Sequence, residues 1–146
     1  MMTVYFECRV QYEKTLEDGS QKKVTESYLL DAVSFTEAEA RIVEEVSPFM
    51  SGEFAVTDIR RTKFAEIISP EGGADDRWYK AKLVFVTMDE KSGKEKRTPY
   101  LCLVRGKGLK GALANLEKGM KGTMGDYDVA AMTETQLLDV FLYSRR

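Results

Sequence analysis

The chain has 146 residues, of which 43% are hydrophobic and 32% charged, and its formal net charge is −2. This composition is typical of a soluble globular protein with an apolar core. The sequence has no histidine and only two cysteines, which excludes serine–histidine catalysis, histidine-ligated zinc and a disulfide framework. No apolar run is long enough to span a membrane, and the first residues, MMTVYFECRV, do not resemble a signal peptide. We therefore expect a cytoplasmic protein with two buried thiols and no cofactor.

The sequence repeats itself at an offset of 73 residues. GEFAVTDIRRTKFAEII (52–68) aligns with GDYDVAAMTETQLLDVF (125–141), and FECRV (6–10) aligns with YKAKL (79–83). A self-match that reaches across both halves predicts two copies of a unit of about 70 residues. The predicted copies are residues 1–70 and 77–146, joined by a linker at 71–76.

The first copy begins with an alternating pattern over residues 3–12, which predicts a half-buried strand. A turn at Asp18-Gly19 predicts a hairpin into a second strand at about 22–33. Thr36 and Glu39 have the spacing of a capping box at the start of a helix, which Pro48 ends. The helix is predicted to bury Ala38, Ile42, Val46 and Phe49 and to expose Glu37, Glu39, Arg41, Glu44 and Glu45.

The repeated stretch follows this helix as a long strand. Its apolar positions change parity between Val56 and Ile59, and the second copy changes parity at the same place, so a bulge or bend is predicted there. The second copy repeats the order with strands at 78–86 and about 95–105, a helix from Leu109, and a last strand that runs to about Tyr143.

Each copy is thus a strand–hairpin–strand–helix–strand unit of the α+β class, with one helix covering one face of a small antiparallel sheet. Neither copy alone is expected to bury enough apolar surface for a stable core. We expect an internal duplication with two small antiparallel sheets or one continuous sheet, arranged about a pseudo-twofold axis.

The sharpest short motif is Gly106-Lys-Gly-Leu-Lys-Gly111, which matches the G-x-G-x-x-G turn of dinucleotide-binding proteins. The surrounding pattern begins with an antiparallel hairpin instead of a βαβ unit, and the equivalent junction in the first copy, 33–39, has no glycine. The junction is therefore structural, although a looser anion site at this helix start stays open.

Charge is distributed unevenly between the copies. Residues 16–53 hold nine acidic and three basic residues, whereas residues 94–122 hold eight basic and two acidic ones. Solvated surface is the ordinary explanation for such runs. The alternatives are a basic patch that binds nucleic acid or another polyanion, and an acidic face that meets a basic face on a partner or a second copy. Exposed Trp78 or Tyr79 could stack on bases. The candidate anion-binding residues are Arg97, Arg105, Lys107, Lys110, Lys118, Lys121, Arg60 and Arg61.

Several stretches resemble a family of gut-bacterial and phage proteins known only as a domain of unknown function. They are SFTEAEARI (34–42), GEFAVTDIRR (52–61), DRWYKAKL (76–83), DEKSG (89–93), GMKGTMGDY (119–127) and MTETQLLDV (132–140). The resemblance implies a cytoplasmic protein encoded on phages or other mobile elements, without an assigned activity or binding residues. We expect a non-enzymatic binding module without a metal site, in which neighbouring acids such as Asp75-Asp76 are solvated. The alternative is a protein–protein adaptor or a self-assembling component.

Overall fold

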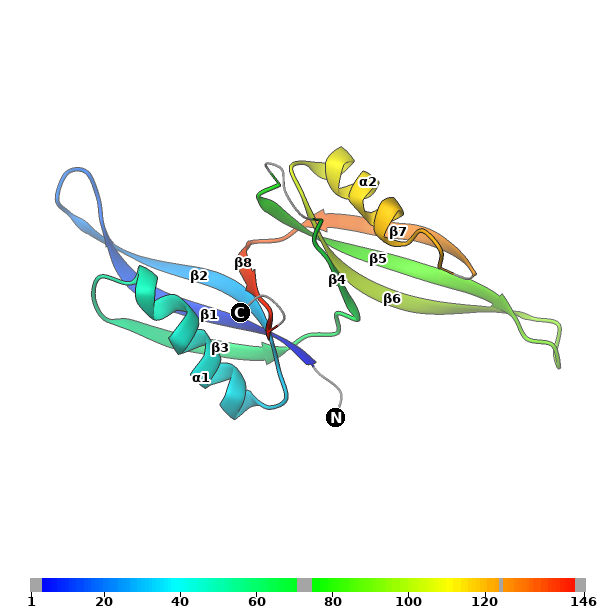
Figure 1. Cartoon of the computed structure of the whole chain (residues 1–146), viewed down its shortest axis with the longest axis horizontal. Helices are drawn as coiled ribbons and strands as arrows, with labels where there is room; N and C mark the ends of the chain where they lie inside the picture. The colour runs from blue at the N-terminus through cyan, green and yellow to red at the C-terminus, as the bar shows by residue number, and fades with distance from the viewer. Residues whose placement is uncertain (1–3, 71–74, 124, 144–146) are drawn as a thin grey trace. The chain divides into compact units, whose positions relative to one another are not determined.

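The computed structural model describes residues 4–70, 75–123 and 125–143, which form two α-helices, one 3-10 turn and eight strands (Figure 1). The strands make two four-stranded sheets, which confirms the α+β class and the two-sheet form of the prediction. The chain divides into two compact units, Met1–Lys63 with Gln136–Arg146 (unit 1) and Phe64–Thr135 (unit 2). Of the predicted linker at 71–76, only Asp75 and Asp76 lie within the described residues.

Unit 1 has the sheet order β3-β1-β2-β8, and unit 2 has the order β4-β6-β5-β7. In each unit the helix lies across one face of the sheet (Figure 1). The elements of unit 1 are β1 (Val4–Thr15), β2 (Gln21–Ala32), α1 (Phe35–Val46), the 3-10 turn η1 (Ser47–Phe49), β3 (Phe54–Arg61) and β8 (Leu137–Phe141). Those of unit 2 are β4 (Glu66–Ile68), β5 (Arg77–Met88), β6 (Glu95–Gly106), α2 (Leu109–Gly119) and β7 (Asp126–Glu134).

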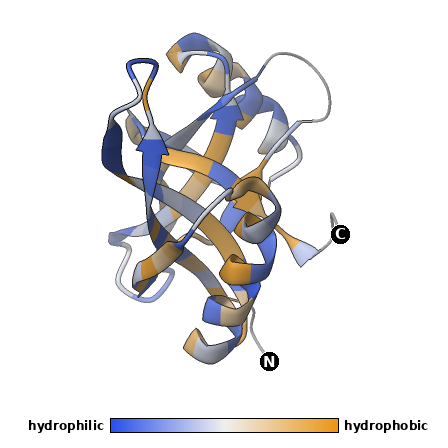
Figure 2. Ribbon diagram, turned by 90° about the vertical axis from the view of Figure 1, so that its left-hand side faces the viewer, coloured by the Kyte–Doolittle hydropathy of each residue, from blue (hydrophilic) through white to orange (hydrophobic). Residues whose placement is uncertain are grey.

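The alternating strands bury one face against their helix. In β1 the side chains of Phe6, Cys8 and Val10 are fully buried, and they pack with Ile42 of α1. Unit 2 has a second core of the same kind, in which Leu83 of β5 packs with Leu116 of α2. Figure 2 shows the resulting mixture of apolar and polar residues along the strands and helices. Burial of each large apolar side chain stabilises its unit by about 1.5–3 kcal/mol.

The start of α1 lies two residues before the predicted one. Ser34 is the N-cap, and its hydroxyl accepts a hydrogen bond from the Glu37 N–H at 3.1 Å. The Glu37 carboxylate accepts one from the Val33 N–H at 3.2 Å. The prediction of a capping box at Thr36 and Glu39 is therefore wrong, because Ser34 and Glu37 have the same spacing and satisfy the first turn.

The predicted bulge is confirmed in both sheets. In unit 1, Cys8 pairs with Ile59 and Val10 pairs with Val56, so Thr57 is the extra residue. This insertion turns Val56 and Ile59, three residues apart, toward the same core. The β5–β7 ladder shifts its register between Lys82 and Leu83 in the same way.

Each sheet is completed by a parallel strand that comes from the opposite half of the sequence. β8 pairs with β2 in unit 1, and β4 pairs with β6 in unit 2. The sheets are therefore mixed, with three antiparallel strands and one parallel strand each. The long strand expected at the end of each copy is in fact two strands, β3 and β4 in the first and β7 and β8 in the second. A short connection, here called the crossing, takes the chain from one sheet to the other, and the apolar pattern does not mark it.

A threonine precedes each crossing. The N–H and the hydroxyl of Thr62 both donate to the Tyr5 carbonyl, at 2.9 and 2.7 Å. Thr135 does the same to the Trp78 carbonyl, at 2.8 Å for each bond. The Ala65 N–H then donates to Leu101 of unit 2, so only two residues connect the last bond of one sheet to the first of the next.

One glycine of the G-x-G-x-x-G motif has a packing role. A Cβ on Gly106 would lie 2.6 Å from the Cα of Ala112, so the bare backbone lets the first turn of α2 approach the end of β6. A Cβ on Gly111 would have no heavy atom within 4 Å. Close helix–strand packing therefore explains Gly106, while nothing in the surrounding packing requires Gly111.

We predict that Gly106→Ala destabilises the protein by about 1–3 kcal/mol, because the added methyl group collides with backbone atoms that cannot turn away. Gly111→Ala is the matched control and should stabilise α2 by up to about 1 kcal/mol through helix propensity. Urea unfolding followed by circular dichroism measures both. Equal stability of the two variants would contradict the close approach.

Both cysteines are fully buried and free. Burial, with the nearby Glu7 carboxylate, raises the pKa of Cys8 to about 12, and burial raises the pKa of Cys102 to about 11. In the unfolded chain both thiols ionise near pH 8.5. The folded state therefore binds more protons above this pH, and the stability that the neutral thiols contribute is lost as the pH rises toward 11–12.

We predict that neither thiol of the folded protein reacts quickly with iodoacetamide at pH 8.5, whereas both react in urea. The urea midpoint should also fall between pH 8 and pH 10. Mass spectrometry counts the labels, and a Cys102→Ser variant isolates Cys8. Rapid labelling of the folded protein at pH 8.5 would refute the burial of these groups.

Candidate functional site

The exposed surface of α2 and its flanks carries four lysines and one glutamate, Glu117. Lys110 and Lys118 lie eight residues apart, close to two helical turns, and Lys107 and Lys121 flank the helix at either end. All four side chains are exposed, and among the described residues none lies within 4.0 Å of an acidic partner. This set of four lysines, here called the lysine stripe, is the part of the predicted patch that lies on α2 and in the turns that flank it.

The four arginines of the predicted patch are engaged elsewhere. Arg97 of β6 pairs with Glu95 at 3.8 Å and with Asp128 at 3.4 Å. Arg60 of β3 pairs with Asp58 at 3.1 Å. Because these pairs are exposed, each is worth about 0–1 kcal/mol and could open for a ligand.

The remaining two arginines lie over aromatic rings. The Arg105 guanidinium is 5.6 Å from the ring of Trp78, and that of Arg61 is 5.8 Å from the ring of Phe6. Arg60 and Arg61 belong to unit 1, whereas Arg97, Arg105 and the lysine stripe belong to unit 2. Trp78 is 2% exposed and Tyr79 is 4% exposed, so both are core residues and neither is free to stack on bases.

The helix of unit 1 carries the opposite charge. Within α1 the acidic residues are Glu37, Glu39, Glu44 and Glu45, and the one basic residue is Arg41. Arg41 was expected to face water, but it is 3% exposed, so that prediction is wrong. Its positive charge is buried and paired inside the unit, so the exposed face of α1 is acidic.

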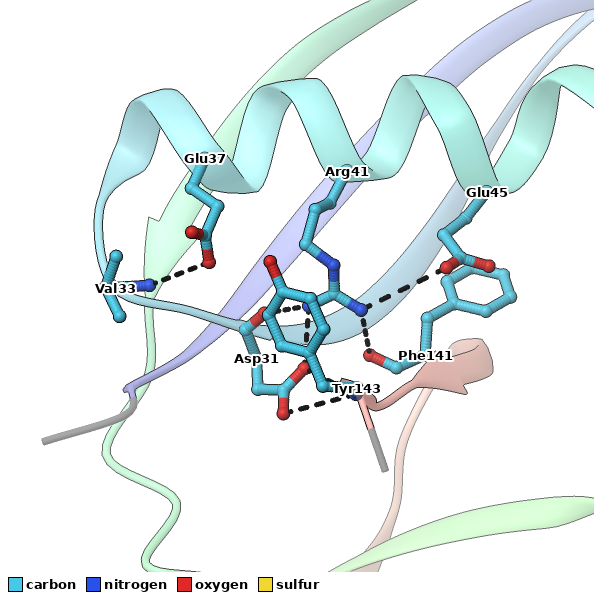
Figure 3. Close-up of polar contacts among 7 residues, drawn as sticks. All are labelled: Asp31, Val33, Glu37, Arg41, Glu45, Phe141 and Tyr143. Atoms are coloured by element: carbon cyan, nitrogen blue, oxygen red, sulfur yellow. Dashed lines mark hydrogen bonds and ion pairs between the residues drawn. The ribbon is translucent and has the colours of Figure 1, made fainter. Parts of the chain in front are cut away.

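Arg41 connects α1 to the end of β2 and to β8 (Figure 3). Its guanidinium donates to the Asp31 carboxylate at 2.7 Å and to the Asp31 carbonyl, and it approaches Glu45 at 4.0 Å. It also donates to the Phe141 carbonyl at 3.4 Å, and the ring of Tyr143 lies 3.8 Å from its Cζ.

Asp31 also binds the chain that follows β8. Its carboxylate accepts a hydrogen bond from the Tyr143 N–H at 3.1 Å. The pair of Arg41 and Asp31 therefore fastens β8 to a sheet that lies far from it in sequence. Arg41 Nε has no hydrogen-bond partner among the described residues, so the network is not fully satisfied.

Unit 2 has an amide at the equivalent place. Asn115 lies 74 residues after Arg41 on α2, and its Nδ2 donates to the Arg105 carbonyl at 2.7 Å and to Asp75 at 3.3 Å. At the other end of the helix, Gly119 lets Ile68 of β4 come close, since a Cβ there would lie 2.8 Å from Ile68 Cγ2. Each exchanged strand is thus fitted to its helix by different chemistry.

Unit 1 also has a shallow hollow of about 280 Å³ between η1 and β8. Phe49, which the sequence pattern placed in the buried stripe, is 78% exposed at its edge, so that prediction is wrong. Pro48 ends α1 and redirects the chain before Phe49 could join the helical face. Leu138 of β8, which lines the same hollow, is 54% exposed.

Within residues 4–70, 75–123 and 125–143, no group of three or more cysteines, aspartates and glutamates could hold a metal ion. In the same part of the chain, neither helix has the length and apolar character needed to cross a membrane.

The structure defines a two-unit α+β protein with exchanged edge strands and two oppositely charged helix faces. A family model for a domain of unknown function, DUF4494, matches residues 4–143. The chain therefore belongs to the DUF4494 family, which confirms the resemblance to a domain of unknown function. A search of the curated proteins finds no match to this chain.

We predict that Arg41→Met destabilises unit 1 by about 3–5 kcal/mol, because it leaves the Asp31 carboxylate without its charged partner. The amides of β8 should lose protection from hydrogen exchange first. Arg9→Met is the matched control: Arg9 forms an exposed pair with Glu7 at 3.7 Å, and its loss should cost about 0–1 kcal/mol. Unchanged exchange of β8 in Arg41→Met would show that Arg41 does not hold this strand.

Proposed function

We propose that this chain is a non-enzymatic binding module whose unit 2 holds a polyanion, the phosphate backbone of a nucleic acid. The single observation that carries this proposal is the lysine stripe. Four exposed lysines follow one helix, without an acidic partner among the described residues. Unpaired lysines on one face can each displace a counterion from a phosphate chain, which is the main source of non-specific affinity.

The arginines have a secondary part in this proposal. Arg97 has to release Glu95 and Asp128 before it can meet a phosphate, and Arg105 is partly buried against Trp78. Arg105 lies near the end of β6, two residues before Lys107. It can therefore extend the stripe at the start of α2. Arg60 and Arg61 lie in the other unit and are not needed for contact with α2.

The two aromatic residues beside the basic run do not favour base reading. Trp78 and Tyr79 are buried, so base stacking by either is not part of the proposal. Phosphate contacts position a protein but do not distinguish sequences. Unit 1 has 13 acidic and 10 basic residues, which restricts the contact to α2 and its flanks. The expected binding is therefore local, salt-dependent and insensitive to sequence.

A protein–protein adaptor is the second candidate, and the hollow beside Phe49 is the observation that favours it. Apolar side chains that stay in water commonly mark a place of association. The acidic face of α1 and the lysine stripe could then orient the partners.

The biological setting is proposed from the sequence resemblance. It favours a cytoplasmic accessory protein of gut bacteria or their phages and mobile elements. The equivalent bulges and threonines lie 73 residues apart and the helix starts 74 apart, and this near-constant offset supports an origin by internal duplication.

We predict that Lys110→Gln with Lys118→Gln weakens binding to a single-stranded DNA oligonucleotide and lowers the slope of log affinity against log salt by about 1.4. Fluorescence anisotropy at several salt concentrations measures this. Glutamine keeps the helix propensity of lysine, so the fold should be unaffected.

Lys22→Gln with Lys23→Gln, on the exposed part of β2 in unit 1, removes the same charge and is the matched control. It should leave the slope almost unchanged. Absence of binding at low salt, or an equal loss in both variants, would overturn the proposal.

A further inference from the structure

The hollow of unit 1 is lined by apolar side chains together with two carboxylates. Its apolar lining combines aromatic and aliphatic side chains, and Phe141 stacks on Tyr28 with ring centroids 5.5 Å apart. Glu26 and Asp139 supply the carboxylates. The lining residues are Tyr12, Glu26, Tyr28, Phe49, Met50, Leu138, Asp139 and Phe141.

Phe49 lies between this hollow and a second one. The second hollow is lined by Pro48 and Phe49 together with Glu44 and Glu45 of α1. Phe49 is 78% exposed and Leu138 is 54% exposed, so two large apolar side chains from separate elements are in water next to carboxylates. Covering them would release water from both at a gain of about 25 cal/mol per Å². The chemistry that fits is a large aliphatic side chain flanked by basic ones.

The first half of α2 presents that chemistry. Leu109 is 54% exposed and Leu113, one helical turn later, is 37% exposed. Lys107 and Lys110 flank them on the exposed surface, and the first turn of α2 contains no acidic residue. The chain therefore carries both an acidic apolar hollow on unit 1 and a basic apolar helix face on unit 2.

We propose that the hollow beside Phe49 receives the Leu109–Leu113 face of α2 from a second copy of this chain. Leu109 and Leu113 enter beside Phe49 and Leu138, and Lys107 and Lys110 meet Glu26 and Asp139. The two surfaces are different, so the contact is head to tail, and an open assembly keeps one unused hollow at one end and one unused helix face at the other.

This contact shares lysines with the proposed polyanion site, so the two should compete. A polyanion that covers Lys107 and Lys110 would release the second copy. The inference does not rest on polyanion binding, because the apolar side chains can be changed without changing any charge.

The experiment uses two uncharged double variants of the full chain. Phe49→Ser with Leu138→Ser removes the hollow's apolar contacts, and Leu109→Gln with Leu113→Gln removes those of the helix face. Analytical ultracentrifugation at low salt measures mass against protein concentration. The natural chain should grow beyond its 16.6 kDa monomer in several steps as concentration rises, and each variant alone should stay monomeric.

An equal mixture of the two variants is the decisive sample. Each variant keeps the surface that the other has lost, so one contact forms and the mixture should stop at twice the monomer mass. If the chain instead formed a twofold-symmetric dimer in which one of these surfaces meets itself, mixing the two variants would create no new contact. The mixture would then show only the masses of the separate variants. Met88→Gln with Val129→Thr changes exposed apolar residues of unit 2 outside α2 and should associate like the natural chain.

Three results would overturn the inference. They are a natural chain that is monomeric at all concentrations, association that neither variant weakens, and a mixture that does not reach the dimer mass. A monomeric chain whose hollow binds a synthetic leucine–lysine helix through Phe49 would also overturn the second copy as occupant, and would assign the hollow to another protein. Both variants keep every lysine, so if the polyanion proposal holds they should bind single-stranded DNA at least as tightly as the natural chain does, and the two proposals fail separately.

Discussion

Both units depend on an exchanged edge strand that pairs in parallel with the sheet of the opposite half. β8 completes the sheet of β1, β2 and β3, and β4 completes that of β5, β6 and β7. A threonine ends the preceding strand in each case, and the crossing takes only a few residues. The exchanged strand is then fixed from the helix side, by the buried Arg41–Asp31 pair in unit 1 and by the close approach of Ile68 to Gly119 in unit 2.

The two helices have equivalent positions but different surroundings. Arg41 is withdrawn from the surface of α1 to hold β8, and the glutamates of that helix give its face a negative character. Asn115 makes shorter-range contacts at the equivalent place in α2, and the lysines remain on the surface. The two units thus have cores of the same kind but differ in the charge on their exposed helix faces.

Local pattern predicted most elements of this fold, including both hairpins, both helices and the bulges. The bulge was visible because Val56 and Ile59 change parity within one strand. The strand exchange was not visible, because β3 and β4 read as one continuous run of strand-forming residues and long-range pairing leaves no local mark. The predicted exposure of Arg41 and the predicted burial of Phe49 were wrong for a related reason. Helical spacing gives the direction in which a side chain points, but it does not say whether a strand or solvent lies on that side. The lysine stripe followed from the charge run alone, whereas the arginine partners required coordinates.

The exchange has a consequence for the order in which the protein is made. Unit 2 is a single uninterrupted segment, Phe64–Thr135, whereas unit 1 needs both Met1–Lys63 and the residues after Thr135. During synthesis the ribosome delivers everything that unit 2 requires while the edge of β2 still waits for β8. Until then that open edge of the nascent chain is the place where a chaperone, or the strand of a neighbouring nascent chain, can bind.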